Sequence, residues 1–175
     1  MATTWKLEPV HSELEFKIRH LMISNVTGTF KKIDGTVETE GDDMATAKIK
    51  FSADVDSIYT HNEQRDGHLK SPDFFDVANH PQISFESTSF QKKDSENFTL
   101  NGNLTMHGAT HPVTLDVEYG GTIKDPYGNT RAGFTVSGKI NRKEWGLTYN
   151  GPTEAGGLML GEDVKVSANV QFLKG

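Results

Sequence analysis

The sequence predicts an all-β fold: an extended, eight-stranded antiparallel barrel with a short helical lid between the third and fourth strands. Three observations lead to this prediction. Apolar and polar residues alternate over about eight segments, as in strands with one buried face. Short turns join nearly all of these segments, which indicates meander order. The first and last segments are both long and amphipathic, and closing the barrel would leave neither as an exposed edge.

The expected strands follow one another along the chain. In the first, Leu14, Phe16 and Ile18 alternate with charged residues. The second is expected over residues 26–38, where two glycines indicate bends of the sheet. The other strands are expected near residues 47–55, 82–90, 98–106, 113–119, 132–140 and 164–172.

Residues 54–85 interrupt the alternation and are expected to form the lid. Thr60 and Glu63 have the spacing of a capping box, which predicts a short polar helix over residues 61–69. The pair Phe74–Phe75 follows in a stretch too irregular to be a strand. The open end of a barrel is the simplest place for these two rings to be buried.

Composition limits the classes of protein to consider. The chain has 175 residues, which suits a single domain over residues 1–175. Its formal net charge of −6 argues against nucleic acid and anionic membranes as partners. No apolar run has the length of a transmembrane segment, and no signal peptide is recognised. We therefore expect a cytoplasmic protein, or a periplasmic one if a leader has been removed.

The inward-facing positions are aromatic or small and apolar, and this mixture would either fill a barrel or line a tube. If the barrel is hollow, an oily ligand suits it better than a sugar or a nucleotide. The candidate ligand-binding residues are Leu14, Phe16, Ile18, Phe30, Phe51, Leu69, Phe74, Phe75, Phe85, Leu104, Phe134, Trp145 and Leu147.

Three polar residues are candidates for contact with a ligand head group, namely His20, Arg65 and Asn150. Arg65 would lie on the lid helix, where a surface salt bridge is the alternative interpretation. Trp145 is also open to two interpretations, as a core plug or as a wall of the cavity.

No residue pattern predicts catalysis or metal binding. His107 and His111 are four residues apart, but across a turn rather than along a helix. Asp73 and Asp76 flank the lid aromatics and are expected to cap turns or lie at a rim, with an acid–base pair as a minor alternative. We therefore assign no catalytic residue, no metal ligand and no cofactor.

Four segments together resemble the YceI-like family of bacterial, lipocalin-like, polyisoprenoid-binding proteins. They are WKLEPVHSELEFKIRHLMISNVTGTF, RDGHLKSPDFFDVANHPQISFEST, NGNLTMHGATHPVTLDV and INRKEWGL. The resemblance implies an extended lipocalin-like barrel, often a homodimer. It also implies an apolar tunnel that binds, stores or transports an isoprenoid quinone, a fatty acid or a fatty amide, with a role in stress response. The positions that match first are Phe74, Phe75, Phe85 and Trp145.

Three functions remain open at this point. The first is non-catalytic binding of a long lipophilic molecule. The second is an enzyme that acts on a lipid in the same cavity, using His20, Arg65 or Asp73. The third is a filled barrel that serves protein interaction. A barrel height of about 28 Å would accommodate a straight fatty acid, whereas a longer isoprenoid would have to bend or protrude.

Overall fold

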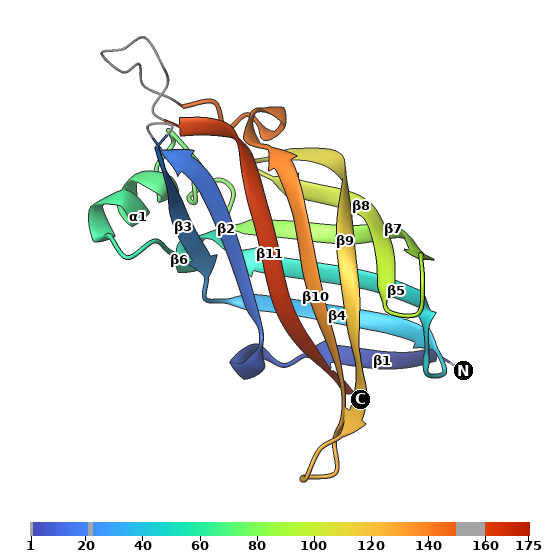
Figure 1. Cartoon of the computed structure of the whole chain (residues 1–175). Coiled ribbons are helices and arrows are strands. Elements are labelled where there is room, and N and C mark those ends of the chain that lie inside the picture. Colours follow the sequence, from blue (N-terminus) through green and yellow to red (C-terminus); the bar gives the residue numbers. More distant parts are fainter. Residues whose placement is uncertain (1, 21–22, 150–159) are drawn as a thin grey trace.

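Antiparallel strands and one short α-helix make up the computed structural model, which describes residues 2–20, 23–149 and 160–175 (Figure 1). The elements are β1 (Ala2–Leu7), η1 (Pro9–His11), β2 (Glu13–His20), β3 (Ser24–Phe30), β4 (Ile33–Glu40), β5 (Asp43–Asp54), η2 (Val55–Ser57), β6 (Ile58–Tyr59), α1 (Glu63–Lys70), β7 (Gln82–Lys92), β8 (Asn97–Met106), β9 (Ala109–Lys124), β10 (Thr130–Asn141), η3 (Arg142–Trp145) and β11 (Leu160–Lys174). All of these strands belong to one sheet.

The sheet closes into a barrel through β1. This strand pairs with β4 on one side and with the end of β11 on the other, where Leu7 lies opposite Phe172. The closed ring runs β1, β4, β5, β7, β8, β9, β10 and β11, which confirms the predicted eight-stranded antiparallel barrel. Closure gives the backbone groups of these strands partners on both sides.

The long strand β11 changes partner along its length. Its first part pairs with β2, where Val166 lies opposite Phe16, and its last part pairs with β1. The turn η1 separates β1 from β2, and Ser12 bridges the change because its hydroxyl accepts a hydrogen bond of 3.0 Å from the backbone N–H of Gln171. Strands β2, β3 and β6 thereby extend the barrel wall toward the α1 end (Figure 1).

One predicted strand is divided in the structure. The segment expected as a single strand over residues 26–38 forms β3 and β4, with a break at Lys31 and Lys32. The break is held by tertiary hydrogen bonds, from the Lys31 N–H to the Ser57 carbonyl at 3.1 Å and from the Asp54 N–H to the Lys32 carbonyl at 2.9 Å. These partners are distant in the sequence, so local alternation does not reveal the break.

Strand β1 lies outside the segments that the alternation predicts, although it closes the barrel. Its two core residues are Trp5 and Leu7, and Pro9 follows so soon that the apolar pattern is too short to identify. Trp5 is 1% exposed, and its indole N–H donates to the Thr39 hydroxyl at 3.1 Å. A buried aromatic ring with its polar atom satisfied makes β1 an integral part of the core.

The lid begins with α1, and its cap differs from the predicted capping box. Asn62 is the N-cap residue, and its side-chain oxygen accepts a hydrogen bond of 2.9 Å from the Arg65 N–H. Thr60 lies before the helix, fully buried, and bonds instead to the side chains of Asp66 and Arg65. The predicted cap was wrong because the chain is still extended at Asn62, and Asn is a stronger N-cap residue than Thr.

Asn62→Ala is expected to lower the local stability of α1 by about 1 kcal/mol, the usual cost of losing an N-cap side chain. Hydrogen exchange of the α1 amides measures this change. Glu63→Ala is the matched control, because Glu63 is exposed and makes no capping bond. Equal protection losses in the two variants would contradict the assignment of Asn62 as the cap.

The segment after α1 returns to the barrel through backbone hydrogen bonds. The Phe75 N–H donates to the Leu69 carbonyl at 3.0 Å, and the Val77 N–H donates to the Lys70 carbonyl at 2.9 Å. Phe74 is buried by this fold-back. Among the described residues, no helix has the length and apolar character needed to cross a bilayer.

Candidate functional site

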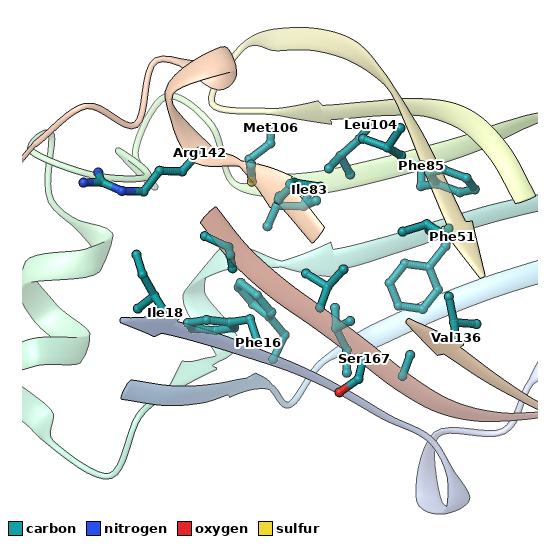
Figure 2. A pocket seen from close by; sticks show the side chains of 18 of the residues that line it. Phe16, Ile18, Phe51, Ile83, Phe85, Leu104, Met106, Val136, Arg142 and Ser167 are labelled. Carbon is teal, nitrogen blue, oxygen red and sulfur yellow. The ribbon is translucent and has the colours of Figure 1, made fainter. Parts of the chain in front are cut away.

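The barrel encloses a cavity of about 410 Å³, within the range of small-molecule sites. Side chains from the barrel strands, α1 and the segment after α1 line it (Figure 2). Strand β9 illustrates why the wall is apolar, because alternate residues of a strand point to the same face. Val113, Leu115 and Val117 face the cavity, while Thr114 and Asp116 alternate with them on the outer side. The barrel interior is therefore hollow rather than filled.

The structure brings nearly all of the sequence-predicted apolar residues together around this cavity. The ones that line it are Leu14, Phe16, Ile18, Phe30, Phe51, Leu69, Phe74, Phe75, Phe85, Leu104, Phe134 and Leu147. Phe16 and Phe51 face the cavity yet remain half-buried rather than fully buried. This partial exposure follows from the hollow, because no packed side chain covers them from the inside.

Two glycines let aromatic rings lie flat against the wall. Phe16 lies beside Gly28 on the neighbouring strand, and Phe85 lies over Gly102. A Cβ atom would approach the Phe16 ring to 2.3 Å at Gly28 and the Phe85 ring to 2.4 Å at Gly102. Any side chain at these two positions would push the rings inward, so the glycines keep the cavity open.

The lid covers the end of the cavity nearest α1. The Phe75 ring packs edge-on against Phe30, with centroids 6.2 Å apart. His68, Phe74 and Tyr149 form a second aromatic group, with centroids 5.0 to 5.1 Å apart. These contacts close the mouth with side chains rather than with sheet hydrogen bonds, so the mouth is the part of the wall that opens most readily.

Of the three polar head-group candidates, the structure places two at the cavity. His20 and Arg65 both line the cavity. Arg65 donates from Nε to the Thr60 hydroxyl at 2.9 Å and from Nη2 to the Thr60 carbonyl. Within the described chain it has no ion pair, so the structure does not support the alternative interpretation of a surface salt bridge. Asn150 lies outside the described residues.

Arg142 is a polar residue of the cavity that the sequence candidates do not include. It is 4% exposed and lines the cavity, and in Figure 2 its side chain lies at one end of the group of labelled lining residues. Its Nε donates to the Gly161 carbonyl at 2.9 Å, and its Nη1 donates to the carbonyls of Leu147 at 2.5 Å and Tyr149 at 2.9 Å. The Asn-Arg pair in INRKEWGL is the signal that could have identified it.

The remaining nitrogen of Arg142 has no partner. Among the described residues, nothing accepts a hydrogen bond from Nη2. Burial lowers the pKa of the guanidinium, and the nearby Glu162 carboxylate opposes this effect. An arginine nevertheless stays charged in proteins, and a buried unpaired donor costs about 1–3 kcal/mol, or more when it is charged. An uncompensated nitrogen in a residue that lines the cavity therefore requires an explanation.

Trp145 occupies the core rather than the cavity wall. It is 1% exposed and is not among the cavity-lining residues. Its indole N–H donates to the Leu104 carbonyl at 2.8 Å, and His107 Nδ1 lies 3.0 Å from its carbonyl oxygen. It therefore acts as a core plug that fixes η3, the short helix that carries Arg142, against β8 and the turn after it.

The other titratable candidates are not among the residues that line the cavity. Asp73 is 2.9 Å from the His68 ring nitrogen, and Asp76 accepts from the Asn79 amide at 2.9 Å. His111 packs edge-on against Trp145. Within the described ranges, no three histidines or carboxylates are grouped as metal ligands would be. Each of these side chains thus has a local structural partner.

The closed barrel and its apolar cavity define a lipocalin-like, cavity-bearing β-barrel. The chain belongs to the YceI-like family, because the model of the YceI-like domain matches residues 5–172. It is 41% identical over 171 residues to a UPF0312 protein of Staphylococcus epidermidis and 42% identical over 171 residues to one of Staphylococcus aureus, with 97% of each chain covered in both cases.

Solved structures share the fold. The YceI protein of Campylobacter jejuni is 29% identical, with a TM-score of 0.78 over 89% of both chains. A polyisoprenoid-binding domain of Saccharophagus degradans has a TM-score of 0.70 over 98% of both chains. BcnA of Burkholderia cenocepacia has a TM-score of 0.81 over 94% of this chain and 98% of its own. The last two are 16% and 17% identical, and they show that this chain has the same fold.

Proposed function

We propose that this protein binds a long-chain lipophilic molecule inside its barrel, an isoprenoid quinone or a fatty acid or amide, for storage or transport and without transforming it. The observation that carries the proposal is the cavity of about 410 Å³, whose lining residues are almost all apolar. Moving a hydrocarbon chain from water into such a cavity is favourable by about 25 cal/mol for each Å² of apolar surface buried. The tail alone can therefore supply the affinity.

Two further observations support this proposal. The Saccharophagus degradans neighbour is described as polyisoprenoid-binding, and it has the same barrel. Of the residues considered for a lipid-directed enzyme, Asp73 lies outside the cavity lining and Arg65 is tied to Thr60. A binding role requires neither of them to be free. The homodimer and the cytoplasmic location remain predictions from the sequence and its resemblance.

Val166→Trp is expected to weaken lipid binding tenfold or more, because it places an indole across the cavity from β11. Lipid is first removed by denaturation and refolding, and uptake of radiolabelled oleyl alcohol is then measured by its retention through gel filtration. Lys165→Trp is the matched control, because Lys165 is the exposed neighbour on the same strand. Equal uptake by the two variants would place the lipid outside the barrel and contradict the proposed function.

A further inference from the structure

The cavity ends at a fixed positive charge. Arg142 is buried, and its Nε and Nη1 are held by three backbone carbonyl oxygens, those of Leu147, Tyr149 and Gly161. Carbonyl oxygens orient a guanidinium but do not cancel its charge. Nη2 keeps both of its N–H groups without an acceptor among the described residues. The side chain is therefore held in place with one side of its guanidinium unused.

The other polar groups around the cavity are basic or neutral. His20, Arg65 and His68 line it together with Arg142, and no acidic side chain of the described chain does so. Two carboxylates near these cations have other partners: Asp66, which follows Arg65, accepts from Thr60, and Glu162, near Arg142, pairs with Lys143 at 2.7 Å. A chain with a net charge of −6 thus keeps its acids off the cavity wall.

We propose that Nη2 of Arg142 binds the anionic oxygen of an acidic lipid head group, a carboxylate or a phosphate monoester. The head would lie beside Arg142 at the α1 end, and the tail would extend toward Val37 and Phe172 at the opposite end of the cavity. This inference rests on the proposed function and deepens it, because it names the chemical class of the lipid.

Arg142 suits this role better than Arg65. Both nitrogens that Arg65 uses donate to Thr60, and the residue is partly exposed, so water screens its charge. Arg142 is buried, and a charge-assisted hydrogen bond is strongest where water is excluded. Because the carbonyls already hold its guanidinium, little side-chain freedom is lost when an anion binds.

Three lipids with one common chain test the inference, namely oleate, oleyl phosphate and oleyl alcohol. Their dissociation constants are measured at neutral pH by competition with radiolabelled oleyl alcohol on the refolded protein. At least one of the acids is expected to bind tenfold or more tightly than the alcohol. Tighter binding of oleate identifies a carboxylate head, and tighter binding of oleyl phosphate identifies a phosphate.

Two variants assign this preference to Arg142. Arg142→Gln is expected to bring the acid-to-alcohol ratio close to one, and Arg142→Lys, which keeps the charge, to retain part of the preference. Lys165→Gln is the control, because it removes a positive charge from the exposed outer face of β11, and it is expected to keep the full ratio. If Arg142→Gln does not fold, the acid-to-alcohol affinity ratio of the wild type still tests the inference. For oleate, this ratio is expected to fall as the pH is lowered, because the lipid carboxylate becomes protonated.

The outcomes separate this inference from the proposed function. Equal binding of all three lipids to the wild type, or a ratio unchanged in Arg142→Gln, would overturn the acidic-lipid assignment while leaving the lipid-binding barrel intact. Failure of every lipid, including the alcohol, to bind would overturn the proposed function itself.

Discussion

Phe75→Asp is expected to abolish lipid retention while leaving the barrel folded. Phe75 lines the cavity at the lid and packs edge-on against Phe30, so an aspartate there removes this ring contact and places a carboxylate against the Phe30 ring. The lid would open toward water to solvate that charge. The eight-stranded ring contains neither Phe75 nor α1. Radiolabelled oleyl alcohol carried through gel filtration measures retention, and circular dichroism reports the sheet.

Tyr127→Asp is the control for this change. It replaces an aromatic ring by the same carboxylate, but Tyr127 is 87% exposed and lies in the turn between β9 and β10. It is expected to retain lipid as the wild type does. Unchanged retention in Phe75→Asp would mean that the segment after α1 does not close the cavity.

Trp5→Ala is expected to lower the free energy of unfolding by about 3–5 kcal/mol, the usual cost of truncating a buried Trp. The indole is 1% exposed in the strand that closes the barrel, and its removal leaves a void between β4 and the end of β11. Urea unfolding followed by circular dichroism measures the change. Trp5→Phe separates packing from the hydrogen bond to Thr39, whose loss alone costs about 1 kcal/mol.

Lys6→Ala provides the comparison for β1, because Lys6 is the exposed neighbour of Trp5. A surface change of this kind is expected to stay within about 0.5 kcal/mol of the wild type. If Trp5→Ala cost no more than Lys6→Ala, β1 would be a dispensable edge rather than the closing strand.

The strands that the sequence reveals are those whose alternation is long. In β2, Leu14, Phe16 and Ile18 alternate with polar residues, and this pattern alone predicts the inward face. Strand β1 has only two core residues before Pro9, which is too few for the period to stand out. The break between β3 and β4 depends on hydrogen bonds to residues more than twenty positions away, which no local pattern contains.

The site likewise has one part that the sequence predicts and another that it does not. Its apolar wall follows from strand parity, so residues such as Phe51 and Phe134 could be placed from the sequence. The roles of Trp145 and Arg142 could not, because both depend on η3 and its contacts. Arg142 stands beside Lys143 and Glu144 in the sequence and has the pattern of a solvated charged turn. Only the carbonyls of Leu147, Tyr149 and Gly161 make it a buried group.

Mass spectrometry of an organic extract tests the lipid-binding account most directly. The protein is purified without detergent, and protein carried through denaturation and refolding provides the control. A long-chain isoprenoid or fatty acyl species in near-stoichiometric amount is expected in the native extract and absent from the control. An extract without lipid, from a protein that also takes up no oleyl alcohol after refolding, would contradict the account.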